Sequence, residues 1–137
     1  MDFARFGHSH PVSAAWQRLE EASALPTQSY AFVGALAESM LKDTPINVLV
    51  ARDSGRVAGL LPLCRDGGAF ARWRQPGARE VFEPADALYA HEAAARDLAQ
   101  QLARQTRPVT LDRVPAGSAL VPALQAAMQG RGLVSVR

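Results

Sequence analysis

Cysteine and histidine, the residues that build cross-links and metal centres, are scarce in this sequence. Cys64 is the single cysteine in 137 residues, beside 3 histidines. One thiol cannot close an internal disulfide, and no Cys-x-x-Cys or Cys/His cluster is present, so the sequence argues against a disulfide framework and against a bound metal. We expect Cys64 to be a small buried hydrophobe in a reducing compartment.

Long apolar runs are absent as well. The longest, residues 57–64, is much shorter than the roughly 20 residues of a membrane-spanning helix. The N-terminus carries Asp2 and continues into His and Ser, which differs from the apolar core of a secretory signal. These features predict a cytoplasmic protein that has no membrane partner.

Neither sign of charge dominates. The chain carries 15 basic and 13 acidic residues, and its basic residues are dispersed apart from Arg72, Arg74 and Arg79. Nucleic-acid binding needs a basic stripe or patch, so we expect no nucleic-acid partner. What remains is an ordinary globular composition, 48% hydrophobic and 20% charged, with enough residues to bury a real core. We therefore treat residues 1–137 as one domain.

Apolar residues at helical spacing mark four segments. Trp16 and Leu19 share one face of the first, for which Ser13 is the expected N-cap, and Pro26 lies beyond its end. Ser118 is the expected cap of the last, and glycines follow that segment. The predicted helices cover residues 14–22, from 27–29 to 41, 91–105 and 118–128.

The clearest element is a β-hairpin. Residues 46–52 and 57–64 are rich in aliphatic and β-branched side chains, and residues 53–56 between them supply turn chemistry. Pro62 cannot donate to a ladder, so we expect it at a strand end, at a bulge or facing a gap between strands. Gly59 indicates a bulge or a close backbone approach. Further strands are predicted at 79–82, 108–114 and 133–137, in a chain that is otherwise irregular over 69–90.

The order of these elements is helix, helix, hairpin, irregular segment, helix, strand, helix, strand. It predicts an α/β fold with a mixed β-sheet, a central antiparallel hairpin and flanking helices. The later strands are joined through helices, so we expect them to run parallel where they are neighbours.

The hairpin residues Val48 to Leu63, which end in Gly-Leu-Leu-Pro-Leu, resemble the central hairpin of the GNAT acyltransferase superfamily. They look most like the CelD group, bacterial proteins linked to the synthesis of cellulose and other exopolysaccharides. Three further stretches fit that group, residues 16–25, 82–86 and 111–118. The resemblance thus covers most of the chain through short motifs.

The resemblance implies a protein with two GNAT-like halves, similar to the peptidoglycan-bridge aminoacyltransferases, of which this chain looks like the N-terminal half. In such proteins the C-terminal half commonly carries the acyl-donor site, and the cleft between the halves receives the acceptor. The implied partners are a C-terminal GNAT half or a second copy, and a saccharide or amine acceptor. Acetyl-CoA or another acyl donor is implied for the full-length acyltransferase, whereas this domain alone would bind no cofactor and be inactive.

A GNAT half that binds acetyl-CoA needs backbone N–H groups in a loop of pattern Arg/Gln-x-x-Gly-x-Gly/Ala directly before a helix. Residues 74–79 hold the first half of this pattern, but Arg79 occupies its last position and Pro76 removes a donor. Gly130 and Gly132 follow a predicted helix and are typical of its C-cap. We therefore expect no pyrophosphate loop in this chain.

Candidate substrate-binding residues lie in the irregular segment. Trp73 and Arg74 offer a stacking surface and a guanidinium fork for an anionic or saccharide ligand. Glu83 and Asp86, near Tyr89, can place two carboxylates beside an aromatic surface suited to a sugar or an amine. The alternative for Trp73 and Arg74 is a strand edge with alternating exposure. The alternative for Glu83 and Asp86 is a turn with solvated acids.

Candidate general bases are His8, His10, His91, Glu83 and Asp86. His8 and His10 form a pair that lacks a third metal ligand, and His91 starts a predicted helix, where it can cap the helix or lie on the surface. No nucleophile shows a recognisable elbow, so catalytic residues stay unassigned.

Three functional hypotheses stay open. The first is an acceptor-side or structural half of a CelD-type acyltransferase. The second is a complete chain that dimerises into a composite acetyltransferase, with the coenzyme at a degenerate loop near Gly77. The third is a non-catalytic interaction module whose exposed apolar surface docks the missing half or a second copy.

Overall fold

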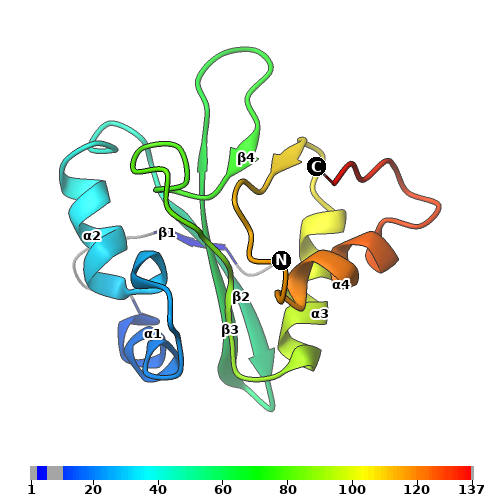
Figure 1. Ribbon diagram of the computed structural model, residues 1–137, viewed down its shortest axis with the longest axis horizontal. Helices are drawn as coiled ribbons and strands as arrows, with labels where there is room; N and C mark the ends of the chain where they lie inside the picture. The colour runs from blue at the N-terminus through cyan, green and yellow to red at the C-terminus, as the bar shows by residue number, and fades with distance from the viewer. Residues whose placement is uncertain (1–2, 6–10, 137) are drawn as a thin grey trace.

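A mixed β-sheet forms the middle layer of the protein, with helices on both sides (Figure 1). The structure, a computed structural model, describes residues 3–5 and 11–136. The strands follow the order β1-β2-β3-β4-β6, and β5 also pairs with β3. The strands are β1 (Phe3–Arg5), β2 (Asn47–Asp53), β3 (Arg56–Arg65), β4 (Trp73–Arg74), β5 (Leu88–Tyr89) and β6 (Val109–Thr110). The predicted α/β class is confirmed.

The β2–β3 hairpin at the centre matches its prediction closely. Ser54 and Gly55 form its turn with φ values of 50° and 80°, the left-handed geometry of a two-residue hairpin loop. The register shifts after Ala51, which faces Gly59, and this shift is the bulge expected there. Gly59 is also a close-approach position, because a Cβ there would lie 3.1 Å from Leu98 Cδ1 and 3.2 Å from Ala51 Cβ.

The side of β3 away from β2 is shared by two short strands. β5 pairs with Gly59 and Leu60, and β4 pairs with Cys64 and Arg65. Pro62 lies between these two pairings, so it faces a gap between strands, one of the three placements expected for it. β4, which was not predicted as a strand, in turn pairs with β6 in parallel, the usual arrangement of neighbouring strands joined through a helix.

The first helical layer packs against one face of the sheet. It consists of α1 (Ser13–Glu20), the 3₁₀ turn η1 (Pro26–Gln28) and α2 (Tyr30–Glu38). Trp16 is fully buried, its indole N–H donates to the Gln28 carbonyl at 2.7 Å, and its ring meets Tyr30 edge-on at 5.5 Å. Ser29 caps α2 by accepting from the Phe32 N–H at 3.1 Å. The expected cap of α1 is wrong, since Val12 stands at that position and Ser13 is already helical.

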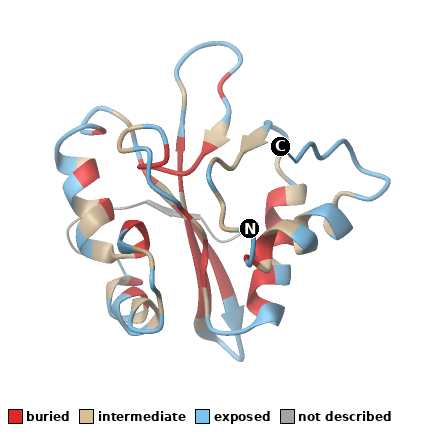
Figure 2. Cartoon of the chain, viewed as in Figure 1, coloured by how far each residue is buried: buried red, intermediate tan, exposed pale blue. Residues whose placement is uncertain are grey.

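The second layer covers the opposite face and consists of α3 (Glu92–Ala103) and α4 (Leu120–Ala127). Leu98 is fully buried against the sheet, and Gln101 Nε2 donates to the Val50 carbonyl of β2 at 3.0 Å. The expected cap of α4 is off by one residue, since Ala119 occupies the cap position, although Ser118 Oγ still accepts from the Leu120 N–H at 3.1 Å. Figure 2 shows the buried residues gathered in the central strands and on the helix surfaces that face them. Among the described residues, no helix has the length and apolar character needed to cross a membrane.

Three predicted strands differ from the structure. Residues 79–82 are not a strand, because a turn closed by the Val81 N–H on the Gly77 carbonyl, at 3.0 Å, occupies their start. Of the strand expected over 108–114 only β6 forms, because only Val109 and Thr110 pair with residues of β4. The segment expected to form the last strand is not assigned as one over its described part, residues 133–136, and these side chains are exposed.

Candidate functional site

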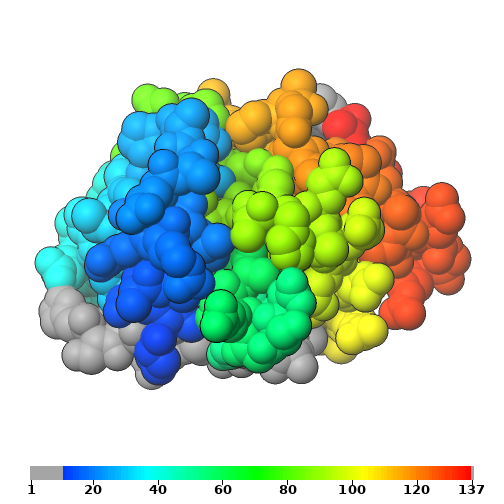
Figure 3. Space-filling model, turned by 90° about the horizontal axis from the view of Figure 1, so that it is seen from below, coloured from blue at the N-terminus to red at the C-terminus, as the bar shows by residue number. Residues whose placement is uncertain are grey.

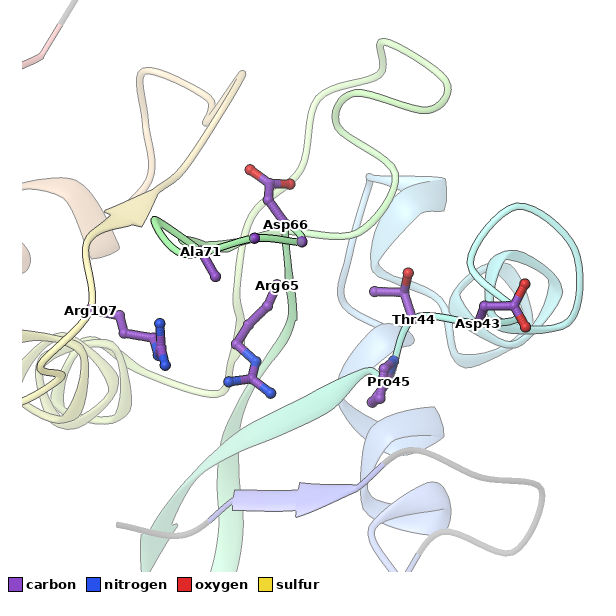
Figure 4. Close-up of a pocket in the computed structure, with 9 residues that line it drawn as sticks. Asp43, Thr44, Pro45, Arg65, Asp66, Ala71 and Arg107 are labelled. Atoms are coloured by element: carbon purple, nitrogen blue, oxygen red, sulfur yellow. The ribbon is translucent and has the colours of Figure 1, made fainter.

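Three loops at one end of the β2–β3 hairpin line a cavity of about 340 Å³ that is open to solvent (Figure 4). The loop before β2 contributes Thr44 and Pro45, and the β3–β4 loop contributes Gly67 and Gly68. The full lining comprises Asp43, Thr44, Pro45, Arg65, Asp66, Gly67, Gly68, Ala71 and Arg107. Its volume falls at the lower end of the range for small-molecule sites.

Strand pairing brings two arginines from distant parts of the sequence to this cavity. Arg65 at the end of β3 is opposite Trp73 of β4, and Trp73 is opposite Val109 of β6. The Trp73 N–H also donates to the Pro108 carbonyl at 2.9 Å, which holds the chain next to Arg107 against β4. Arg65, Trp73 and Val109 are therefore neighbours across three strands, and this pairing brings Arg65 and Arg107 to the same end of those strands.

The two guanidinium groups at the cavity are exposed and reach into the same opening (Figure 4). The Arg65 guanidinium lies over the Trp73 ring, 5.4 Å from its centroid. Neither Arg65 nor Arg107 has a carboxylate partner within residues 3–5 and 11–136. The Asp43 and Asp66 carboxylates point away from both guanidinium groups (Figure 4).

Behind the cavity lies a network of ion pairs centred on Arg74. The buried Arg74 guanidinium contacts Asp66 at 2.6 Å and Glu80 at 2.7 Å. Arg79 joins the same network, with Asp66 at 3.0 Å and Asp112 at 3.1 Å. Both oxygens of Asp66 are therefore engaged by arginines other than Arg65.

These contacts set the ionisation of the network. Burial alone would raise the pKa of Glu80, but the hydrogen bonds from Arg74 and the Gly77 N–H outweigh burial and lower it. The pKa of Asp66 is lowered in the same way, because the hydrogen bond from Arg74 and the charge of Arg79 exceed the effect of burial. The pKa of Arg74 is raised, since its bonds to the two carboxylates overcome the burial that would lower it. The network is thus fully ionised near neutral pH.

Cys64 lies beside this network and is fully buried, as expected. Burial raises the pKa of its thiol to about 11, and the carboxylates of Glu80 and Asp66 add to that rise. The nearby positive charges of Arg74 and Arg79 only partly oppose it. Because the thiolate is the reactive form, Cys64 is chemically quiet at neutral pH.

The structure divides the five predicted substrate-binding residues into two groups. Trp73 and Arg74 form β4, where Trp73 stacks on Arg65 and Arg74 turns inward to the ion pairs. Asp86 and Tyr89 lie at β5, and Glu83 is exposed in the loop before them. On β3, Tyr89 is opposite Gly59 and Arg74 is opposite Cys64, five residues further along, so these members of the two groups are roughly 17 Å apart along the strand.

Asp86 and Tyr89 meet at the start of α4. The Ser118 hydroxyl donates to the Asp86 carboxylate at 2.8 Å, and the Ala119 N–H donates to the Tyr89 hydroxyl at 3.0 Å. Burial raises the pKa of Asp86, while the hydrogen bonds from Ser118 and the Ala87 N–H offset part of that rise. These contacts hold a carboxylate of raised pKa close to a phenol, an arrangement suited to a hydroxyl or amine ligand.

The start of α3 is occupied by protein groups. His91 stands at its cap and accepts the Ala94 N–H on Nδ1 at 3.2 Å, the capping role expected for it. Its Nε2 lies 3.5 Å from Asp53 in the hairpin turn, and Glu92 adds a negative charge to the first turn of the helix. Figure 3 shows the start of α3, in yellow-green, packed beside the hairpin turn.

The glycine loop at residues 74–79 is also engaged internally. The Gly77 N–H donates to the Glu80 carboxylate at 2.8 Å, so an acid of the protein already holds this donor. Gly77 has a φ of 91°, and a Cβ there would lie 3.0 Å from the Phe32 ring, which shows how closely the loop packs on α2.

The remaining histidine predictions concern His8 and His10, which lie outside the described residues. Across 3–5 and 11–136, no three His, Cys, Asp or Glu side chains are grouped as metal ligands would be. Sequence reasoning did not single out Arg65 or Arg107. Each is an arginine next to a strand end, and only the pairing of β3, β4 and β6 reveals that they share a cavity.

In comparisons with known proteins, the chain matches no family model, no curated protein and no solved structure. Its function is therefore inferred from its residues and their geometry.

Proposed function

We propose that this chain is a GNAT-like domain of the CelD type that supplies acceptor-side surface and packing to an acyltransferase, while a second GNAT-like half holds the acyl donor. Support comes from the order of elements, with two helices before a central hairpin and a third helix after the irregular segment. On this proposal the isolated chain is inactive, and the acceptor is a saccharide or an amine.

The observation that carries the proposal is the closed start of α3. A coenzyme diphosphate binds at a helix start through free N–H groups and the positive end of the helix dipole. Here the His91 imidazole takes the Ala94 N–H, and Glu92 adds a negative charge that repels an anion. The alternative loop at Gly77 offers its N–H to Glu80 instead. Neither place presents the set of free donors that a diphosphate needs.

The acceptor side is best placed at Asp86 and Tyr89. Both are half-buried, so they retain some contact with solvent and with a ligand. Hydrogen bonds with Ser118 and Ala119 hold the two side chains in place. Within the described residues only one of the two Asp86 carboxylate oxygens accepts a hydrogen bond, so the second is left for a ligand. A sugar hydroxyl or an amine could donate to the second oxygen. Glu83 stands nearby in sequence with an exposed carboxylate.

Calorimetric titration of acetyl-CoA into the pure chain tests this proposal. We expect no saturable heat, whereas a GNAT enzyme with an intact pyrophosphate loop, measured in parallel, should bind. Tight binding at one acetyl-CoA per chain would contradict the proposal and favour the complete, donor-binding enzyme. Half-stoichiometric binding by a dimer would favour the composite acetyltransferase.

A second candidate, the interaction module, is favoured by exposed apolar side chains near the C-terminus. Leu133 is 99% exposed, and Val134 and Val136 are also exposed, in a segment whose composition favours a strand. An unpaired segment of this kind can add to the sheet of a second copy.

Light scattering addresses this second candidate. We expect the pure chain to form dimers, and the double variant Leu133→Asp, Val136→Asp to shift them to monomers. Phe70→Asp is the matched control, since Phe70 is 93% exposed but lies in the β3–β4 loop. A wild-type chain that stays monomeric at high concentration would contradict the interaction-module hypothesis.

A further inference from the structure

We propose that the cavity between Arg65 and Arg107 binds the phosphate group of a small organic phosphate. The site is separate from Asp86 and Tyr89, where we place the acceptor, and the proposal does not rest on the acyltransferase assignment. It rests on the difference between arginines that form ion pairs with carboxylates of the protein and arginines that do not.

Two arginines line the cavity, and two others hold the ion-pair network behind it. Arg74 and Arg79 each contact two carboxylates at 2.6 to 3.1 Å, and their charges are balanced. Arg65 and Arg107 have no such partner in the described residues, although both line the cavity. Two guanidinium groups without carboxylate partners that face one opening form a site for an anion. A bound anion relieves the repulsion between the two positive charges and accepts hydrogen bonds from both.

The acids on the cavity wall do not supply that counter-charge. Asp66 gives one carboxylate oxygen to Arg74 and the other to Arg79. Its lowered pKa keeps it ionised within that network. The Asp43 carboxylate points away from Arg65 and Arg107 (Figure 4). The face of the cavity that carries the two guanidinium groups is therefore positive.

Further donors point to a phosphate in particular. The N–H groups of Gly67 and Gly68 make no hydrogen bond in the described part of the chain, and no atom lies within 4 Å of a Cβ built at either glycine. The chain there is open to close approach by a ligand. A phosphate has enough oxygens to engage two guanidinium forks and backbone donors together, whereas a carboxylate has only two. The cavity of about 340 Å³ leaves room for the organic part.

Trp73 is a positioning residue in this site. Its ring lies 5.4 Å below the Arg65 guanidinium and holds that side chain over the cavity. It also provides the readout, because the chain has 2 tryptophans and therefore two indole N–H signals in a ¹H–¹⁵N spectrum. The other indole, Trp16, is buried and hydrogen-bonded to the Gln28 carbonyl, so it serves as an internal reference.

The experiment titrates the full chain with inorganic phosphate, glucose 1-phosphate, glucuronate and glucose. We expect glucose 1-phosphate to shift the Trp73 indole signal saturably, inorganic phosphate to do so more weakly, and glucose to have no effect, while the Trp16 signal stays in place. Absence of any saturable shift with either phosphate would overturn the proposal. Tighter binding of glucuronate than of glucose 1-phosphate would overturn the assignment to phosphate.

Variants measured by calorimetry locate the site. Arg65→Ala and Arg107→Ala should each weaken glucose 1-phosphate binding by about tenfold or more, since each removes one charge-assisted pair. Neither side chain forms an ion pair in the described residues, so the thermal unfolding of Arg107→Ala should match wild type, and that of Arg65→Ala should differ only through the lost contact with the Trp73 ring. Arg56→Ala is the control, because Arg56 is exposed on the same strand, about 30 Å away at nine residues of 3.3 Å each. An equal loss in the Arg56→Ala variant would show that net charge alone attracts the anion and would overturn the site.

Discussion

Replacing Arg74 by Met should lower the free energy of unfolding by about 3–5 kcal/mol, because it leaves the largely buried Glu80 carboxylate without its partner. The Arg74 side chain is 10% exposed and its partner Glu80 is 12% exposed, so water cannot replace the lost contacts. Urea denaturation at pH 7 measures the loss. If the Met variant does not fold, Glu80→Gln gives a milder test, since it keeps the shape of the partner and removes its charge.

Arg79→Met is the matched control for this substitution. Arg79 touches the same Asp66 but its side chain is 45% exposed, so we expect a loss of about 1 kcal/mol or less. Equal losses for the two variants would contradict the view that burial of Arg74 makes the network important.

The same network makes stability depend on pH. The pKa values of Glu80 and Asp66 are lowered from ordinary values of 4.5 and 3.8, so in the folded state both acids hold their protons less tightly than in the unfolded state. Their contribution is complete above those ordinary values and is lost as the pH falls through the lowered values. The wild-type chain should therefore lose stability below about pH 4.5, and the Arg74→Met variant should lose less over the same interval.

Trp16→Ala should lower the free energy of unfolding by about 3–5 kcal/mol, the usual cost of emptying the site of a large buried aromatic. The indole is fully buried beneath α1, and its loss also leaves the Gln28 carbonyl without its donor. The stability of Trp16→Phe should lie between those of wild type and Trp16→Ala, because phenylalanine restores most of the volume but not the hydrogen bond to Gln28. Chemical denaturation measures all three proteins.

Trp73→Ala is the comparison for Trp16. Trp73 is only half-buried, so its truncation should cost clearly less stability than that of Trp16. If the two alanine variants were equally stable, the first helical layer would not be anchored by Trp16 as described.

The elements that the sequence predicted well are those whose signals are local. The hairpin follows from its aliphatic runs and from Ser54 and Gly55, which accept the left-handed turn. The position of Pro62 in a gap between strands follows from its lack of an N–H to donate to a neighbouring strand. The four helices follow from the helical spacing of their apolar residues, although the two predicted caps, Ser13 and Ser118, do not occupy the cap positions.

The elements that it missed depend on distant partners. β4 and β5 have only two residues each and exist because β3 offers them a ladder, which no periodicity can reveal. Residues 133–136 have strand-like composition, yet they have no neighbour to pair with among the described residues. The burial of Arg74 was equally hidden, since alternating Arg-Trp-Arg is typical of an exposed edge, whereas the partners Asp66 and Glu80 turn it inward.

The candidate site shows the same division. Capping was one of the two roles expected of His91, because it depends on adjacent residues, whereas the contact of Asp86 with Ser118 joins segments 32 residues apart. The cavity at Arg65 and Arg107 arises only from the order of three strands.

Crystals of this chain grown with acetyl-CoA test most directly whether one copy can hold a coenzyme diphosphate. We expect the His91 cap on the Ala94 N–H and the Gly77 contact with Glu80 to be intact, with no coenzyme at either place. Density for a CoA diphosphate held by the N–H groups at the start of α3, with His91 displaced, would contradict the account.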